Sequence, residues 1–282
     1  MTMLDRASEP PDRLLSVMTW NIDGWHTIRD AQVNLLDTMG GELALLQEVT
    51  PKSADVLRDA GWEIVTALDQ LSPTHRERED RRPRFSCGVA ARGRLSLIGA
   101  HVIADAPSPS RTLVARVESP GGAFTAISAA LPPGSMWGRT GKQAQARAIE
   151  AQLLATNDPA LVGMDRNGPK YERFEPAGTE WWPEDDPSVF AHDALHGLRD
   201  VLRTHYDEHP ELRARAHAER PDGPLAIPYM EQRTTPPTPR RYDVILASPE
   251  WEVIGVTYDY AASVAAGSDH SFVCARVQPW WG

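Results

Sequence analysis

Acids, amides and one imidazole recur where short apolar runs of the sequence begin or end. These polar positions are Asn21 in TWNIDG, Glu48 in LLQEV, Asp165 and Asn167 in GMDRN, Asp243 in RRYDVIL, and Asp269 and His270 in GSDH. One such residue usually caps a turn. A charged or amide side chain beside an apolar run is costly unless something pairs with it, so the whole set indicates convergence on a metal ion.

Magnesium fits the chemical types in this set. Mg²⁺ takes near-octahedral oxygen ligands, usually one or two carboxylates together with water and substrate phosphate. Phosphoester cleavage also needs a base for water and a polar clamp on the phosphate. Glu48, Asp165, Asn167 and His270 supply these groups. We therefore expect a hydrolase of phosphoester or phosphodiester bonds that depends on magnesium, with manganese as the alternative ion.

Apolar periodicity and turn residues predict the elements that position these side chains. Strands are expected at 14–22, 42–49 and 63–68, and helices at 29–39 and at 53–61, the latter with Ser53 as its N-cap. Four further strands between 85 and 131, a helix at 141–156 and four strands after it complete the pattern. This order predicts an α/β (α+β) fold: a four-layered sandwich of two packed, mainly antiparallel sheets flanked by helices.

One domain is expected over 14–282, after a polar leader at 1–13 and with a long irregular insertion at about 169–239, which holds one helical piece around 188–206. The formal net charge of −10 argues against a tight grip on long nucleic acid through many phosphate contacts. No secretory or membrane-spanning segment is apparent, so we expect a cytoplasmic monomer. Cys87 and Cys274 lie in apolar runs and are expected to be buried, reduced thiols.

The polar blocks also carry a family resemblance. TWNIDG, LLQEV, D-x-N, RRYD and GSDH follow one another in the order of the signature blocks of the endonuclease/exonuclease/phosphatase (DNase I-like) superfamily. The resemblance extends over roughly residues 14–280. TWNIDG and LLQEV particularly resemble tyrosyl-DNA phosphodiesterase two, whereas GSDH is equally similar to abasic endonucleases. The resemblance implies a nuclease-like phosphodiesterase.

The resemblance implies a metal site and its ligands. Glu48 matches the principal metal-binding glutamate of the superfamily. Asn21 matches the asparagine that steadies the metal site, and Asp269 would lie beside the metal.

The resemblance also implies catalytic roles. Asp165 would orient or deprotonate the attacking water, and Asn167 would hold a phosphate oxygen. His270 would face the scissile phosphate, oriented by Asp243. Arg111 stands where many members carry a phosphate-facing arginine.

Ala130 in SAALPPG departs from the superfamily pattern, which usually has a histidine or tyrosine there. An alanine cannot donate a proton, and the loss of one such donor costs about 10²–10³ in rate. A side chain such as His26 or an arginine of the charge-dense stretch 76–84 could fill the gap. Otherwise the protein is slow, or it is a pseudoenzyme that serves as a binding module.

The class of substrate stays open at this point. Nucleic acid, nucleotides, and phospholipid or inositol phosphates are all candidates, because function belongs to the site rather than to the fold. The stretch 76–84 is either a solvated loop or an arginine rim for an anionic substrate. Trp181–Trp182 either pack the insertion or stack on a base or sugar.

Histidines supply one rival site. His192, His196 and Asp200 have i, i+4 and i+8 spacing, which on a helix would place them on one face and could bind zinc. The alternative is a structural Asp200. His205 and His209 repeat the spacing in a more polar segment and are expected at the surface.

Overall fold

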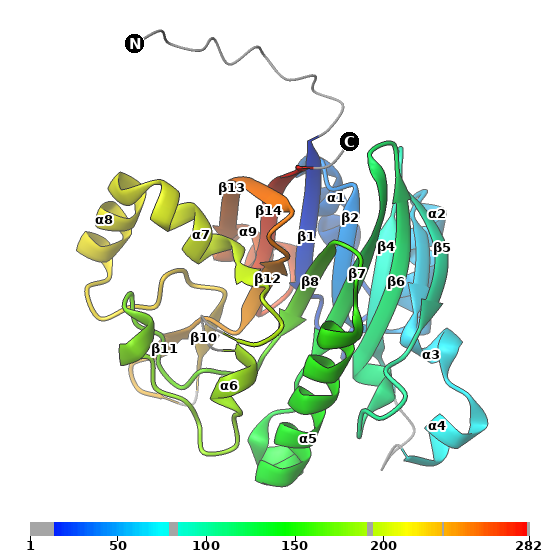
Figure 1. The fold of residues 1–282 in the computed structure, drawn as a ribbon, viewed down its shortest axis with the longest axis horizontal. Coiled ribbons are helices and arrows are strands. Elements are labelled where there is room, and N and C mark those ends of the chain that lie inside the picture. Colours follow the sequence, from blue (N-terminus) through cyan, green and yellow to red (C-terminus); the bar gives the residue numbers. More distant parts are fainter. Residues whose placement is uncertain (1–13, 79–83, 191–193, 233, 281–282) are drawn as a thin grey trace, which may run out of the picture.

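The protein forms two large sheets that pack face to face, with helices over their outer faces (Figure 1). A computed structural model describes residues 14–78, 84–190, 194–232 and 234–280. Each large sheet has six strands. The expected four-layered α/β sandwich is therefore confirmed. The predicted leader at 1–13 lies outside the described residues.

The first sheet has the strand order β13-β14-β1-β2-β4-β3. Its strands are β1 (Leu15–Asn21), β2 (Leu43–Val49), β3 (Glu63–Thr66), β4 (Ser86–Ala91), β13 (Trp251–Asp259) and β14 (Phe272–Pro279). Only β1 and β2 run parallel, and Asn21 pairs with Gln47. Because parallel strands end at the same edge, the carboxyl ends of β1 and β2 bring Asn21 and Glu48 to one side of the molecule.

The second sheet has the order β5-β6-β7-β8-β12-β9. Its strands are β5 (Ser96–His101), β6 (Thr112–Ser119), β7 (Gly122–Ala130), β8 (Ala160–Asp165), β9 (Arg199–Asp200) and β12 (Asp243–Ala247). Strand β8 is parallel to β7 and antiparallel to β12, so Asp165 pairs with Ala130 on one side and with Asp243 on the other. Antiparallel pairing explains why a residue at the start of β12 meets residues at the ends of other strands.

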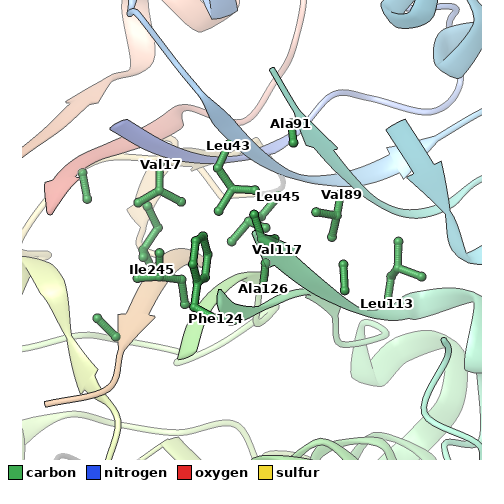
Figure 2. Close-up of a cluster of buried hydrophobic side chains, with 14 of the residues drawn as sticks. Val17, Leu43, Leu45, Val89, Ala91, Leu113, Val117, Phe124, Ala126 and Ile245 are labelled. Carbon is green, nitrogen blue, oxygen red and sulfur yellow. The ribbon is translucent and has the colours of Figure 1, made fainter. Parts of the chain in front are cut away.

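The core between the sheets consists of apolar side chains from both inner faces. Figure 2 shows Val17, Leu45 and Val89 of the first sheet against Phe124 and Ile245 of the second. All five side chains are fully buried. Burial of this kind is the main favourable contribution to folding.

The two sheets approach each other closely at Gly163 of β8. A Cβ atom built there would lie 2.6 Å from the Cβ atoms of Thr19 and Leu45 on the first sheet. Real Cβ contacts are not that short, so only glycine fits. The spacing of the sheets next to the polar strand ends depends on this missing side chain.

Helices cover both outer faces. On the first sheet, α1 (Asp30–Thr38), α2 (Pro51–Asp59) and α9 (Tyr260–Ala266) bury residues such as Leu36 and Leu57 against β1 and β2. On the second, α5 (Gly134–Ala155) buries Ile149 and Leu153. Short helical turns occur at α3 (Ala67–Gln70), α4 (Pro73–Arg78), η2 (Pro109–Arg111) and η3 (Pro176–Gly178).

The start of α2 corrects one expectation. Thr50 rather than Ser53 is the N-cap, because the Thr50 side chain accepts a hydrogen bond from the Ser53 main-chain N–H. Ser53 is instead buried, and its hydroxyl accepts a hydrogen bond from the main chain of Ile28. Proline at the first position, Pro51, moves the helix start two residues earlier than expected.

The segment 169–239 contains more regular structure than expected. It holds α6 (Pro187–Phe190), β9, α7 (Val201–Glu208), α8 (Pro210–Glu219) and a hairpin of β10 (Tyr229–Glu231) and β11 (Thr238–Arg240). The helical piece expected around 188–206 is wrong as a single unit. Gly197 adopts a positive φ of 72° in a turn, and β9 then pairs with β12.

The zinc hypothesis fails for the same reason. Residues 194–200 form a turn and a strand, so His196 and Asp200 do not share a helix face; His192 lies outside the described residues. Asp200 caps α7 by accepting from the main chain of Leu202 and Arg203, which confirms the structural reading. His205 is only 8 % exposed, which corrects its expected surface position, whereas the side chain of His209 is 43 % exposed.

Both cysteines are free and buried, as expected. Burial raises the pKa of the Cys87 thiol to about 12 and that of Cys274 to about 11. None of the helices in the described part of the chain has the length and apolarity needed to cross a bilayer.

Candidate active site

A β-bulge directs Glu48 toward the end of the sandwich. Strand β2 pairs with β4 at Leu46–Gly88 and again at Val49–Ser86, so two residues of β2 oppose one of β4. Such a bulge bends the strand and re-aims a side chain. Glu48 has a positive φ of 61°, which is costly for a residue other than glycine. Local strain therefore accompanies the placement of this carboxylate.

Glu48 is partly buried and has few partners. Its Oε2 accepts a hydrogen bond of 3.0 Å from the main-chain N–H of Gly24. Burial raises the pKa of Glu48, although the Gly24 hydrogen bond and the nearby charge of Arg111 act in the opposite direction. The charges of Asp165 and His270 act on the same carboxyl group. The two sheets thus bring these polar residues into electrostatic contact.

Asp165, at the end of β8, is held by two amide side chains. Its Oδ2 accepts hydrogen bonds from Asn21 Nδ2 at 3.3 Å and from Asn167 Nδ2 at 3.1 Å. Its Oδ1 accepts from the Asn167 main-chain N–H at 3.0 Å. This contact from Asn21 crosses between the sheets. The carboxylate of Asp165 therefore has a fixed orientation.

His270 and Asp243 form a buried pair. His270 Nδ1 lies 2.7 Å from Asp243 Oδ2. Burial raises the pKa of Asp243 to about 6, while the positive charge of His270 opposes the rise. Burial would lower the pKa of His270, but the charge of Asp243 outweighs it and raises that pKa to about 10. The imidazole is therefore positively charged at neutral pH.

The GSDH segment fixes the main chain around this imidazole. Trp20 Nε1 donates to the carbonyl of His270 at 2.9 Å, and Ser268 Oγ accepts from the His270 N–H at 3.1 Å. Ser268 Oγ in turn donates to the Asn21 carbonyl at 2.7 Å. The ring of Tyr229 lies 4.8 Å from that of His270. Sequence reasoning missed Ser268, Trp20 and Tyr229, because only the tertiary structure places them beside the imidazole.

The donor atoms suit a hard cation. Oxygen atoms of Asp165 and Asp243 lie within 4.8 Å of each other and of a ring nitrogen of His270, which as a cation is a neighbour and not a ligand. Asp243 Oδ1 is buried without a hydrogen-bond partner among the described residues. Glu48 adds a carboxylate from the facing sheet. Asp269 is exposed and stands outside the group of three, although its charge acts on Asp243 and His270.

An aromatic and cationic rim lies beside Glu48. Trp25, which follows Gly24, is 71 % exposed, and its ring meets that of Phe85 at 6.2 Å between centroids. The Arg84 guanidinium carbon lies 6.0 Å from the Trp25 ring, and that of Arg111 lies 6.0 Å from the Phe85 ring. Sequence reasoning selected Arg111 but missed Trp25 and Phe85.

Ala130 is a packed core residue at the end of β7. It is 3 % exposed, belongs to the cluster between the sheets, and pairs with Asp165. His26 does not fill the expected gap, since its side chain is 60 % exposed and lies 3.8 Å from Asp23. Most side chains of the stretch 76–84 lie outside the described residues.

Comparisons with known proteins identify the fold. No family model matches the sequence, and no curated protein is similar enough to match it. The structure is similar to TDP2 of D. rerio complexed with a single-strand DNA product, with a TM-score of 0.62 and 16 % identity over 95 % of this chain and 100 % of that one. It is also similar to the human Nocturnin catalytic domain with bound sulfate, with a TM-score of 0.61 and 15 % identity over 95 % of both chains.

A third similar structure is an endonuclease/exonuclease/phosphatase from Beutenbergia cavernae, with a TM-score of 0.61 and 19 % identity over 95 % of this chain and 72 % of that one. At these identities the comparisons show the fold. The chain has the fold of the endonuclease/exonuclease/phosphatase superfamily, as its sequence blocks implied.

Proposed function

We propose that this protein is a magnesium-dependent hydrolase of phosphodiester bonds. The observation that carries the proposal is the convergence of polar side chains from both sheets. Asn21, Glu48 and His270 come from the first sheet or its edge, and Asp165 and Asp243 come from the second. Solved proteins of this fold include an endonuclease and a DNA-bound TDP2.

Magnesium, or manganese in its place, fits these residues. Among the described residues, Oδ1 of Asp243 is buried without a hydrogen-bond partner, and the partly buried carboxylate of Glu48 accepts a hydrogen bond from Gly24. Hard divalent cations prefer such oxygen ligands. Glu48 would hold the ion, with Asn21 and Asp269 close to it. When bound, the cation neutralises negative charge on the substrate phosphate.

The protein's own residues then divide the remaining work. His270, held through Nδ1 by Asp243, presents its other ring nitrogen as a cationic donor toward the negative charge that develops on the phosphate. Asp165, fixed by Asn21 and Asn167, orients the attacking water and accepts its proton. Asn167 and Arg111 bind phosphate oxygens.

The rim favours a substrate that carries a base. A ring that stacks on exposed Trp25 would keep its phosphate close to Arg111 and Glu48. Aromatic platforms bind single-stranded bases with little sequence preference. Nucleotides or nucleic-acid ends are therefore preferred over phospholipid and inositol phosphates.

A substrate screen tests the proposal. The purified chain is assayed with magnesium or manganese against DNA, RNA, inositol phosphates, sphingomyelin and small nucleotides, with chelator as the blank. We expect metal-dependent turnover of DNA, RNA or nucleotides, and its loss in His270→Asn. Turnover that the variant keeps would come from a contaminant and would defeat the proposal.

A pseudoenzyme is the second candidate, because of one observation. Ala130 leaves no proton donor at the end of β7, next to Asp165. In that case the site binds a metal and a phosphate ester but does not cleave it. Binding of a nucleotide without turnover in the same screen would favour this alternative.

A further inference from the structure

A cavity lies outside the second sheet, between β12 and α6. Its volume is about 320 Å³, at the lower end of the range of about 300–1,000 Å³ for small-molecule sites. One water occupies about 30 Å³ of liquid, so the space is far larger than a single buried water. Leu246 of β12 and Val189 and Phe190 of α6 form part of its apolar wall.

The polar wall of this cavity contains two charged side chains that each have one atom without a hydrogen bond among the described residues. Arg166 and Glu172 are each only 5 % exposed. Arg166 Nε and Glu172 Oε2 are buried and have no hydrogen-bond partner among the described residues. Buried polar atoms without a partner are rare in native proteins and call for an explanation. Both side chains line the same space.

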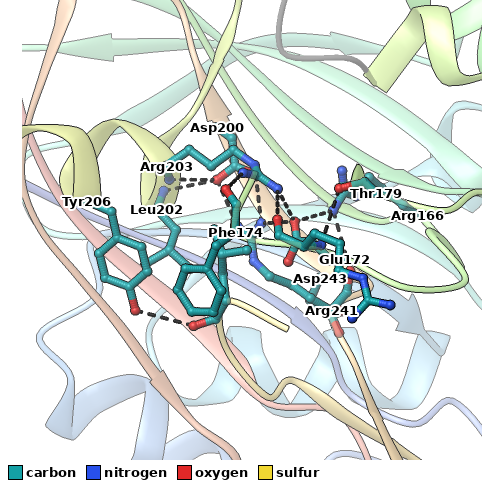
Figure 3. A network of polar contacts seen from close by, with 12 residues as sticks. Arg166, Glu172, Phe174, Thr179, Asp200, Leu202, Arg203, Tyr206, Arg241 and Asp243 are labelled. Carbon is teal, nitrogen blue, oxygen red and sulfur yellow. Dashed lines mark hydrogen bonds and ion pairs between the residues drawn. The ribbon is translucent and has the colours of Figure 1, made fainter. Parts of the chain in front are cut away.

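The charges around the cavity do not balance. Arg241 lies 2.8 Å from Asp200 and 2.9 Å from Glu172, and Arg203 lies 3.2 Å from Glu172 (Figure 3). Arg166 approaches Glu172 only to 3.9 Å. Within the described part of this network, three guanidinium groups thus share two carboxylates. Burial lowers the pKa of Arg166, the charge of Glu172 opposes this, and the neighbouring Arg241 cation lowers the pKa further.

An aromatic surface adjoins the unbalanced cation. The guanidinium carbon of Arg166 lies 5.9 Å from the centre of the Trp181 ring. Trp181 itself stacks on Phe190, at 6.3 Å and an interplanar angle of 23°. Trp182 lies instead near Lys170 and Arg240, at 5.8 and 5.9 Å, and is absent from the cavity wall.

We propose that this cavity binds a small organic anion in which a flat ring carries a carboxylate or a phosphate. The anionic group pairs with Arg166, an N–H or O–H of the ligand donates to Glu172, and the ring packs against Trp181. This site is separate from the proposed active site. Arg166 follows Asp165 in the chain, but its side chain joins the network of Figure 3 rather than the Glu48–His270 cluster.

Calorimetric titration of the full chain tests the proposal with two ring-bearing probes and one ring-free probe. The probes are a nucleoside 5′-monophosphate, indole-3-carboxylate and inorganic phosphate. The first probe carries a phosphate and the second a carboxylate. The probe that binds more tightly identifies which of the two anionic groups the cavity prefers. We expect at least one to bind with a Kd below about 1 mM, and phosphate alone to bind at least about tenfold more weakly.

Two adjacent tryptophans provide a matched control. Trp181→Leu should weaken binding of the ring-bearing probe at least about tenfold, whereas Trp182→Leu should leave its Kd unchanged. Glu48→Gln should also leave the Kd of indole-3-carboxylate unchanged, because this probe is not a phosphate ester and the proposed active site is elsewhere. Failure of both ring-bearing probes to bind, equal effects of the two tryptophan variants, or loss of binding in Glu48→Gln would overturn the proposal.

The charge balance gives a second test that does not depend on the ring. Arg166→Gln removes the cation that would pair with the anionic group, so it should abolish probe binding. It leaves two guanidinium groups with two carboxylates, so the Tm measured without probe should be maintained. Arg241→Gln, which removes the paired arginine, should lower the Tm clearly. If Arg166→Gln lowers the Tm as much as Arg241→Gln, Arg166 is an ordinary structural partner and the ligand site is refuted.

Discussion

Lys142 of helix α5 donates a hydrogen bond of 2.6 Å from Nζ to the main-chain carbonyl of Asn167. The same Nζ lies 2.6 Å from Asp185 Oδ1, and both side chains are 1 % exposed. Asn167 has a positive φ of 47°, a conformation that asparagine tolerates better than most residues. The buried Lys142–Asp185 ion pair thus stabilises the turn in which the Asn167 side chain donates to Asp165.

Removal of Lys142 should destabilise the protein strongly. Lys142→Met leaves Asp185 as an uncompensated buried charge, a loss that typically costs about 3–5 kcal/mol. The double variant Lys142→Met/Asp185→Asn should recover part of it. Urea unfolding measures both, with Lys170→Met as the exposed control, since its partner Glu180 lies 3.9 Å away at the surface. A small loss in Lys142→Met would mean that the pair is not essential to the fold.

Glu48→Gln should weaken metal binding and metal-dependent turnover. Glutamine keeps the shape of the side chain and can still accept from Gly24, but it removes the charge. We expect activity to fall at least about tenfold, or about 1.4 kcal/mol. Activity and calorimetric titration with Mg²⁺ measure the effect, and Glu63→Gln, at an exposed strand position, is the control. Unchanged metal affinity would remove Glu48 from the metal site.

Stability should fall as the pH rises from about 6.5 to 8. The folded-state pKa of His270 is about 10, against an ordinary value of about 6.5 in the unfolded chain. The folded state therefore retains a proton that the unfolded state loses. The stabilisation is complete below pH 6.5 and declines by up to about 1.4 kcal/mol per pH unit. Burial also raises the pKa of Asp243, to about 6. Its titration therefore lowers the stability in the same way as the pH rises, but at lower pH.

Urea unfolding of the wild type and of His270→Asn across this range checks the pH effect. The window lies below the ordinary pKa values of thiols and tyrosines, so their titration does not contribute. The decline should be absent in His270→Asn and present in His209→Asn, whose side chain is 43 % exposed. An equal slope in all three proteins would exclude His270 as its source.

Gly163→Ala should destabilise the sandwich. The new methyl group would lie 2.6 Å from Thr19 and Leu45, so the sheets must separate, and overpacking of this kind costs about 1–3 kcal/mol. Denaturant unfolding measures the loss. Gly99→Ala, in strand β5 with no atom within 4 Å of the added Cβ, is the matched control. Equal stability of the two variants would show that the sheets leave room for a methyl group at Gly163.

Ala130→His should lower both stability and turnover. The side chain of Ala130 is buried in the cluster between the sheets, so an imidazole has no room unless Asp165 moves. Ala130→Ser adds a donor with little volume and should keep the Tm. Steady-state kinetics and thermal unfolding of both variants provide the test. A higher kcat in Ala130→His at an unchanged Tm would instead show an open space that lacks a donor.

Local sequence determined the elements and most of the polar set. Apolar runs that end in acid or amide, such as ELALLQEV and ALVGMD, predict strands with a costly polar group at the edge, and Glu48 and Asp165 lie there. The order of these blocks was sufficient to predict the two-sheet sandwich. These inferences succeed because burial pattern and strand ends are short-range properties of the chain.

Long-range pairing decided the rest. The antiparallel pairing of β12 with β8 places Asp243 beside Asp165, and Asp243 also contacts His270. A bulge of β2 opposite β4 points the side chain of Glu48 toward the site. The helix expected around 188–206 does not form as one unit because β9 pairs with β12. The Lys142–Asp185 pair and the unbalanced Arg166 depend on contacts between residues far apart in the chain, and no local pattern encodes which distant charges will share one buried space.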